Sequence, residues 1–157
     1  MPFLSVFKRK GLNGLGFSTT AEEATEGLDL TGKRVLITGV NSGIGLETAE
    51  VMSARGACVL GLSRTQAKSD SISHLMNNNY IPLECELSEP DSIVSCVDII
   101  KSSGHKIDII ICNAGIMAVP ELTIKYGLEL QFLTNHIGHF ILVNSLIDLL
   151  NEKARIV

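Results

Sequence analysis

A strand-like run, a glycine-rich turn and a helix-like run follow one another around residue 40, and this order constrains the fold most strongly. The strand-like run Arg34–Thr38 is followed by GVNSGIG at residues 39–45 and then by a run with helical spacing. Glycines let the backbone turn tightly and approach a pyrophosphate, and the first N–H groups of the following helix point toward its negative charge. The order therefore predicts a phosphate-binding nucleotide site; the alternative is a glycine-rich turn without a ligand.

Apolar runs and helical runs alternate from residue 33 onward, which is typical of an α/β domain. We expect five strands, at residues 35–38, 58–62, 80–84, 107–112 and from 155 onward. Pro82 cannot donate a hydrogen bond to a sheet ladder, so the third strand is expected at an edge. Right-handed crossovers between parallel strands then give a doubly wound, Rossmann-like parallel sheet of strand order 3-2-1-4-5. We expect this sheet to be truncated at its fifth strand.

The helical runs predict four helices between these strands. They are expected at residues 44–55, more weakly through 72–76, after a cap formed by Ser88 and Asp91, and at 127–150. The last helix is apolar around most of its circumference. We therefore expect it to be covered on several sides.

The length of 157 residues suits one buried core. We expect residues 33–157 to form a dinucleotide-binding domain, incomplete at its C-terminus, and residues 1–32 to form an N-terminal extension. Thr20 and Glu23 have capping-box spacing for a short helix in the extension, and Gly27 is expected to end it. The apolar residues of the extension either pack on the domain or make a weak membrane-surface contact; they are Phe3, Leu4, Val6 and Phe7.

Composition and charge narrow the classes of function. A net charge of −4 and a pI near 5.5 argue against a nucleic-acid partner. No apolar run reaches the length of a membrane span, and the predicted location is the cytoplasm. The four cysteines form no Cys-x-x-Cys pair, so reduced thiols are expected. His136 and His139 stand three residues apart with no evident third ligand, so no metal site is predicted.

The predicted sheet places two motifs at one crevice. Its switch point lies between the first and fourth strands, so residues 39–45 and Asn113-Ala114-Gly115 face the same space. Small residues after the fourth strand leave room for a flat ring system there. An amide in that position can tie one strand to another or contact a ribose.

Three motifs in this order resemble the short-chain dehydrogenase/reductase family. They are TGxxxGxG from Thr38, NAG from Asn113 and NHIGHF from Asn135. The last motif most resembles the retinol-dehydrogenase-like branch of that family. The match runs from about residue 30 to residue 157 and corresponds to the amino-terminal half of the family's domain.

The resemblance implies a role for each matching position. By the resemblance, the cofactor pyrophosphate and the adjacent ribose are held by Gly39, Ser42, Gly43, Ile44 and Gly45. The adenosine side of the cofactor is lined by Asn113, Ala114 and Gly115. Asn135 matches the family's active-site asparagine, whose backbone carbonyl holds a water in a proton relay. Glu86 and Leu87 occupy the place of the family's Asp-Leu pair beside the adenine, and the longer carboxylate leaves its geometry open.

Charge at the end of the second strand favours NADP(H) over NAD(H). Sites for NAD usually place a carboxylate there to bind the ribose 2′-hydroxyl. This sequence has no carboxylate between Glu50 and Asp70, and instead Arg64 ends the strand, with Lys68 following. A guanidinium can pair with a 2′-phosphate and stack on adenine. The alternative for Arg64 is a solvated surface charge.

The catalytic groups of the resembling family are not all found in this sequence. The family uses a serine, and a tyrosine with a lysine four residues later, to exchange the substrate proton. Neither Tyr80 nor Tyr126 has a lysine at that spacing. The resemblance therefore implies the cofactor-binding half of an alcohol or carbonyl oxidoreductase, which in its complete form is a homo-oligomer with a small-molecule substrate. The alternative is a non-catalytic dinucleotide-binding or interaction module.

Overall fold

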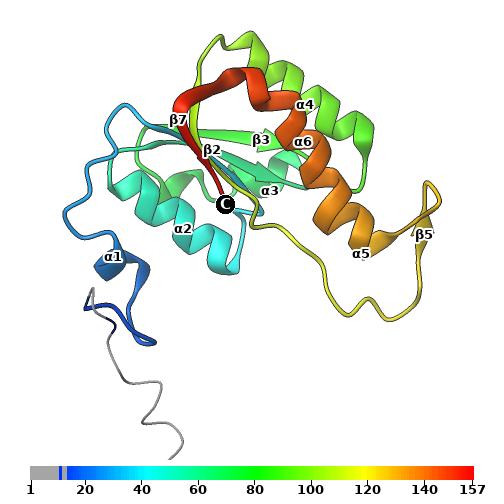
Figure 1. Cartoon of the computed structure of the whole chain (residues 1–157), viewed down its shortest axis with the longest axis horizontal. Coiled ribbons are helices and arrows are strands. Elements are labelled where there is room, and N and C mark those ends of the chain that lie inside the picture. Colours follow the sequence, from blue (N-terminus) through cyan, green and yellow to red (C-terminus); the bar gives the residue numbers. More distant parts are fainter. Residues whose placement is uncertain (1–10, 12–13) are drawn as a thin grey trace, which may run out of the picture.

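The computed structural model describes residue 11 and residues 14–157, and its centre is a five-stranded parallel sheet (Figure 1). The strand order β3-β2-β1-β4-β7 confirms the predicted 3-2-1-4-5 order, with β7 as the fifth strand of the prediction. The central strand β1 (Arg34–Thr38) lies between β2 (Cys58–Ser63) and β4 (Ile107–Ile111). β3 (Tyr80–Glu84) lies at one edge, as its proline predicted.

The other edge strand, β7 (Leu150–Ile156), begins five residues earlier than the predicted start at 155. It pairs with β4, and the register shifts between Ile107 and Ile109. Asp108 lies at this shift, and its carboxylate accepts hydrogen bonds from the backbone N–H of Arg34 at 2.9 Å and from the Asn151 amide at 3.0 Å. One side chain thus links three neighbouring strands at the amino-terminal end of β1.

Helices cover both faces of the sheet, as a doubly wound fold requires (Figure 1). Alternate side chains of β1 point to opposite faces. Val35 and Ile37 pack in one core with Ala49 of α2 (Gly43–Ala54). Leu36 packs in the other core, to which α4 (Pro90–Ser102) and α6 (His139–Leu146) contribute. Because both faces are buried, the central strands consist almost wholly of apolar residues.

Two shorter predictions differ from the structure. The weak helix predicted through 72–76 is instead a short helix α3 (Gln66–Asp70) followed by a 3₁₀ turn η2 (Ser73–Leu75). The predicted cap of α4 by Ser88 and Asp91 is wrong, because the N-cap residue is Glu89 and its side chain makes no capping bond. The Ser88 hydroxyl donates instead to the Glu86 carboxylate at 3.1 Å.

The long helix predicted at 127–150 is wrong at its start, whereas its predicted end is confirmed to within one residue. It begins with α5 (Leu130–Phe132), continues through a π-helical segment η3 (Leu133–Gly138) into α6, and ends with a 3₁₀ turn η4 (Ile147–Leu149). The Glu129 carboxylate caps its first turn, accepting from Gln131 N–H at 2.9 Å and from Phe132 N–H at 2.8 Å. A capping carboxylate at this position starts the helix three residues later than predicted.

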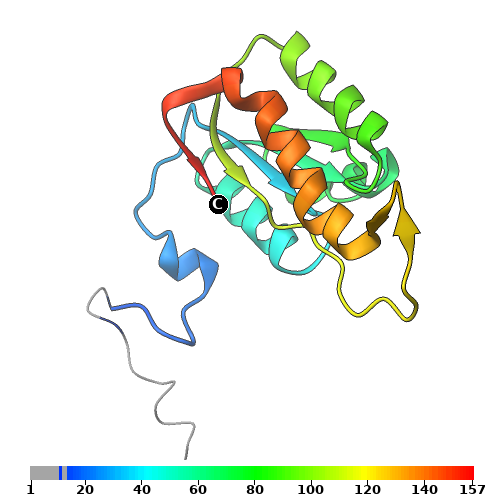
Figure 2. The same ribbon diagram turned by 45° about the vertical axis from the view of Figure 1, so that its right-hand side comes forward.

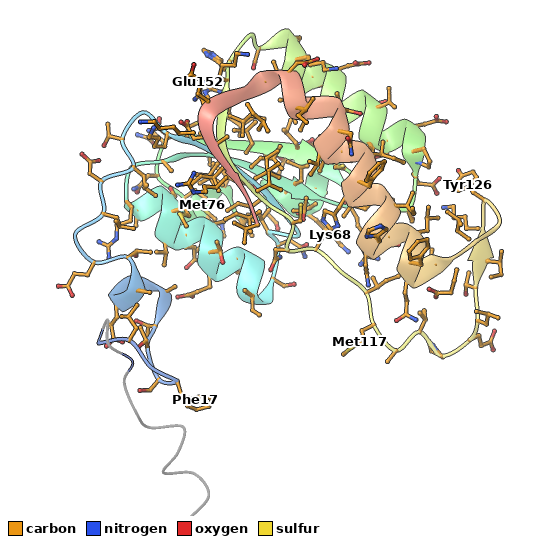
Figure 3. The ribbon with its side chains drawn as sticks, viewed as in Figure 1. Phe17, Lys68, Met76, Met117, Tyr126 and Glu152 are labelled. Atoms are coloured by element: carbon orange, nitrogen blue, oxygen red, sulfur yellow. The ribbon has the colours of Figure 1, made fainter. Side chains whose placement is uncertain are left out.

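A β-hairpin occupies the start of that predicted helix. Its strands are β5 (Ile124–Lys125) and β6 (Leu128–Glu129), and they stand beside α5 in Figure 2. Tyr126 and Gly127 both have positive φ, 53° and 76°, as a tight two-residue hairpin turn requires. The Tyr126 hydroxyl donates to Glu89 at 2.8 Å, and Lys125 forms an ion pair with the same carboxylate. Glu89 therefore fastens the hairpin to the start of α4.

The capping box predicted in the N-terminal extension is confirmed. Thr20 and Glu23 exchange backbone-to-side-chain bonds of 3.1 and 3.2 Å around α1 (Ala21–Ala24). Gly27 follows in a turn with φ of 78°. Arg55, at the end of α2, donates to the Glu22 carbonyl at 2.8 Å and so holds α1 against α2. The prediction for Phe3, Leu4, Val6 and Phe7 lies outside the described residues.

Candidate nucleotide-binding site

A cleft of about 450 Å³ opens at the carboxyl ends of β1, β2 and β4. The residues that follow these strands meet there, because parallel strands end at the same edge of a sheet. Of the residues predicted from the sequence, those that line the cleft are Gly39, Ser42, Ile44, Gly45, Arg64, Glu86, Leu87, Asn113, Ala114 and Gly115. Gly43 and Asn135 do not line it. Asn135 lies behind Gly115, where an added β-carbon would be 3.4 Å from its Oδ1 atom.

The glycine turn has the geometry of an anion cradle. Gly39 has φ of 75°, and a β-carbon there would lie 3.0 Å from Ala114. A β-carbon on Gly45 would overlap the carbonyl of Gly39 and the amide of Asn113. Gly39 therefore lets the turn approach the segment after β4, and Gly45 lets α2 pack closely against the turn. Gly43 has φ of 61° but open space around it, so its requirement is conformational.

The N-terminus of α2 faces the turn without a competing acceptor. Ser42 is the N-cap residue, but its side chain makes no capping hydrogen bond, and the first turn contains no acidic residue. The first N–H groups of a helix lack partners within the helix, and the helix dipole favours an anion beside them. The turn and the helix together can hold a phosphate group.

Hydrogen bonds tie the glycine turn to the end of β4. The Asn113 amide donates to the Thr38 carbonyl at 2.9 Å, and the Ala114 N–H donates to the Thr38 hydroxyl at 2.9 Å. The sequence predicted that Asn113 could link one strand to another. The structure adds Thr38, which is 1% exposed and whose hydroxyl is positioned by this bond.

Asn135 braces the segment that leaves β4. Its Oδ1 accepts from Ile116 N–H at 2.8 Å and its Nδ2 donates to the Ile116 carbonyl at 2.8 Å. Its backbone carbonyl accepts a hydrogen bond from the Nδ1 atom of His139 at 3.0 Å. All three polar groups of Asn135 beyond its N–H thus have partners. Burial lowers the pKa of His139 and keeps the ring neutral.

Arg64 lies at the cleft directly after β2 and is exposed. It forms no hydrogen bond or ion pair with any other residue in the described part of the chain. Lys68 is exposed on α3 and does not line the cleft. The guanidinium is therefore the cationic group available to a ligand in this cleft.

The loop after β3 forms the opposite wall. The Glu86 carboxylate accepts through Oε1 from the Ser88 N–H at 3.0 Å, which fixes the carboxylate in a turn and leaves its second oxygen available. Leu87 is buried and packs against Gly138. A β-carbon on Gly138 would overlap the Leu87 carbonyl, so the helix approaches this wall closely because its residue 138 is glycine.

Two buried hydroxyls at the cleft were missed in the sequence. Ser63 and Thr134 both line it, and their Oγ atoms make no hydrogen bond within the described residues. An unpartnered buried hydroxyl is costly, so both sites fit a polar ligand that completes their bonding. The position of Ser63 at the end of β2, next to Arg64, could have indicated its place at the cleft. Thr134 lies in the π-helical segment η3, and only the packing of that segment brings it to the cleft.

The four cysteines are free thiols, and Cys85 lines the cleft. A side-chain hydrogen bond with Cys96, together with burial, raises the pKa of Cys85, and burial raises that of Cys112. The Cys85 and Cys112 thiols therefore stay protonated at neutral pH. His136 stacks on Phe132, with ring centroids 5.3 Å apart, and does not approach a metal-ligand geometry with His139. No group of three metal-ligating side chains occurs within residues 14–157.

Comparisons with known proteins agree with this arrangement. The family model described as short chain dehydrogenase matches residues 33–157. The chain is 39% identical, over 94% of its length, to 48% of the short-chain dehydrogenase TIC 32 A, chloroplastic, from Brassica napus. It is 34% identical, over 80% of its length, to 39% of retinol dehydrogenase 13 from Homo sapiens.

A solved structure shows the same fold. A 3-ketoacyl-(acyl-carrier-protein) reductase from Brucella melitensis, complexed with NADH, superposes with a TM-score of 0.67 at 26% identity. The superposition covers 77% of this chain and 51% of the reductase. The chain spans a half or less of the length of the curated relatives described above. In the part of the chain that the structure describes, no helix is both long enough and apolar enough to cross a membrane.

Proposed function

The chain belongs to the short-chain dehydrogenase family, and on this premise we propose that residues 33–157 form the NADP(H)-binding part of an oxidoreductase acting on an alcohol or carbonyl compound. The single observation that supports this most is the cleft itself. It combines a glycine turn, an uncapped helix N-terminus and two unpartnered hydroxyls at the switch point of the sheet. Together these groups fit a pyrophosphate and its attached riboses.

Each wall of the cleft has a part in this proposal. The turn at Gly39 and the N–H groups of α2 hold the pyrophosphate, while Ala114 and Gly115 leave room for the adenosine side. Glu86 accepts from the adenine amine through its free oxygen. A bound nicotinamide dinucleotide supplies the hydride chemistry of this family. By the family resemblance, Asn135 holds a water of the proton relay through its backbone carbonyl.

The preference for NADP(H) rests on Arg64. This guanidinium follows β2, lines the cleft and has no partner among the described residues, which supports a role in pairing with a ribose 2′-phosphate. The resembling reductase was solved with NADH, so the family alone gives no preference. A charge-assisted hydrogen bond contributes roughly 1.5–3 kcal/mol, which corresponds to about ten- to hundredfold in affinity.

The test is to measure the dissociation constants of NADPH and NADH by fluorescence titration. We expect Arg64→Asp to weaken NADPH binding by about ten- to hundredfold while leaving NADH within about threefold. Lys68→Asp is the matched control, because it makes the same change of charge at an exposed site outside the cleft. Tighter binding of NADH than of NADPH by the unaltered chain, or an equal loss in both variants, would contradict the preference.

Further features of the whole protein belong to the same proposal. We expect a homo-oligomer, since the family resemblance places the helix α5–α6 at a subunit interface. Phe132, Phe140 and Ile147 on this helix are exposed and support that expectation. The cytoplasmic location stays a prediction, and a relative is named as chloroplastic.

A further inference from the structure

His139 connects two parts of the cleft that lie far apart in the sequence. Its side chain is buried, and both ring nitrogens are engaged. The Nε2 atom lies 2.8 Å from the Thr38 hydroxyl, 101 positions earlier in the chain. The Nδ1 atom lies 3.0 Å from the backbone carbonyl of Asn135. The ring therefore bridges the end of β1 and the π-helical segment.

Only one neutral tautomer satisfies both contacts. A carbonyl oxygen accepts but never donates, so the proton must be on Nδ1. Nε2 is then an acceptor, and the Thr38 hydroxyl donates to it. The same hydroxyl oxygen accepts from Ala114 N–H at 2.9 Å. The hydrogen bonds form one directed chain, from Ala114 through Thr38 and His139 to Asn135.

The contact between the ring and this carbonyl lies in the π-helical segment and at its end. The backbone N–H of His139 bonds to the carbonyl of His136, not to the carbonyl four residues back. The His139 N–H therefore does not occupy the Asn135 carbonyl, and the His139 ring bonds to that carbonyl instead. Widened turns of this kind frequently occur at functional sites.

We propose that His139 is a positioning residue: as the Nδ1–H tautomer, with Nε2 held by the Thr38 hydroxyl, it fixes the backbone carbonyl of Asn135 relative to the glycine turn. The expected effect on cofactor binding rests on the proposed function, because a cleft that holds a dinucleotide needs Asn135 and the glycine turn in fixed relative positions. Asn135 in turn clamps Ile116, which lines the cleft. The chain of bonds thus couples the three motifs of the sequence through one imidazole.

An ordinary packed histidine is the competing explanation, and His136 provides the comparison. His136 is exposed and stacks on Phe132, whereas His139 is the one buried histidine of the four, all of which lie in the described part of the chain. A histidine that only fills space has no required tautomer. A histidine that holds Asn135 must carry its proton on Nδ1.

The first measurement is a long-range ¹H–¹⁵N correlation spectrum of the uniformly labelled 157-residue chain at neutral pH. The three exposed histidines, His74, His105 and His136, are internal references. We expect His139 to show a single Nδ1–H tautomer with Nε2 shifted as a hydrogen-bond acceptor. Thr38→Ser should preserve that acceptor shift, and Thr38→Val should remove it. An Nε2–H tautomer, or averaging between tautomers in the unaltered chain, would overturn the proposal without any variant.

Two near-isosteric variants separate the ends of the bridge. In His139→Asn, the side-chain amide occupies the place of Nδ1 and retains the bond to Asn135. In His139→Gln, the amide occupies the place of Nε2 and retains only the contact with Thr38. We expect the Asn135 carbonyl ¹³C and Ile116 amide resonances to stay near their original positions in the Asn variant and to move in the Gln variant.

The affinity for NADPH should follow the same pattern. We expect its dissociation constant to rise about fivefold in His139→Gln, the effect of one lost hydrogen bond, and less than about twofold in His139→Asn. Equal effects of the two variants on resonances and affinity would overturn the proposal. If the unaltered chain binds no NADPH but shows the Nδ1–H tautomer and the variant pattern in its resonances, the proposed function fails and the positioning of Asn135 stands.

Discussion

The glycine turn gives a sharp test of how closely α2 must approach β1. Gly45 lies in the first turn of α2, and a β-carbon there would overlap the carbonyl oxygen of Gly39 and the side-chain amide of Asn113. Even the carbonyl carbon of Gly39 would lie only 2.9 Å away. Both obstacles are fixed: Gly39 is backbone, and Asn113 donates to the Thr38 carbonyl at 2.9 Å.

Gly45→Ala must therefore move the helix or break the Asn113 bond. Overpacking of a close contact costs about 1–3 kcal/mol, and the loss of one hydrogen bond adds about 1 kcal/mol. We expect the free energy of unfolding to fall by roughly 2–4 kcal/mol. For a chain of this length, such a loss lowers the melting temperature by roughly 6–12 °C.

Gly43→Ala is the matched control, because a β-carbon there meets nothing within 4 Å and only the positive φ is unfavourable. That conformation costs a non-glycine residue about 1–2 kcal/mol. Urea titrations and thermal melts of both variants, followed by circular dichroism, measure the difference. Should Gly45→Ala prove no more destabilising than Gly43→Ala, the close approach of α2 to the turn would be refuted.

Three further predictions concern other parts of the chain. Burial alone would raise the pKa of Asp108, but bonds from Arg34, Lys33 and Asn151 outweigh it and lower that pKa. The ionised Asp108 carboxylate therefore stabilises the fold above the ordinary carboxyl pKa, and this stabilisation is lost as the pH falls through the lowered pKa. Asp108→Asn should lower the free energy of unfolding by roughly 1–2 kcal/mol at pH 7. It should also remove the pH dependence of that free energy, measured by urea titrations between about pH 4 and pH 2. The exposed apolar side chains on α5–α6 should make the chain bind an apolar dye and self-associate. Phe140→Glu should reduce dye binding and self-association, measured by fluorescence and sedimentation, while changing the melting temperature by less than about 2 °C. A monodisperse chain without dye binding would contradict this. No tyrosine of this chain has a lysine four residues later, and a general acid accelerates such reactions about a hundred- to ten-thousandfold. We therefore expect no oxidation of NADPH above background with aldehydes or ketones. Equal rates in this chain and in one extended to the length of its relatives would be contrary evidence.

The sequence signals that succeeded are local ones. The strand-like run before residue 39, the spacing of the glycines and the position of Pro82 predicted the central strand, the turn and the edge strand. Each depends on residues within one or two turns of chain, where backbone sterics and missing donors act directly. The strand order followed because the handedness of parallel crossovers leaves few alternatives.

The failures lie where distant contacts compete with local preference. Apolar residues at helical spacing predicted one helix over residues 127–150, but Glu89 fastens a hairpin over its first turn. Tyr126 adopts a positive φ that its residue type disfavours, and the contact with Glu89, 37 positions away, accompanies it. Periodicity carries no information on such a contact.

The same division holds at the cleft. Glycine and small-residue motifs sufficed to indicate which segments meet at the switch point, because a parallel sheet brings strand ends together whatever their side chains. The sequence could not show that Thr38 and His139 are hydrogen-bonded or that Leu87 packs against Gly138. Nor could it show that the hydroxyls of Ser63 and Thr134 lack partners within the described residues. These features depend on distances of a few ångströms between residues up to 101 positions apart, which only the packed helices and sheet determine.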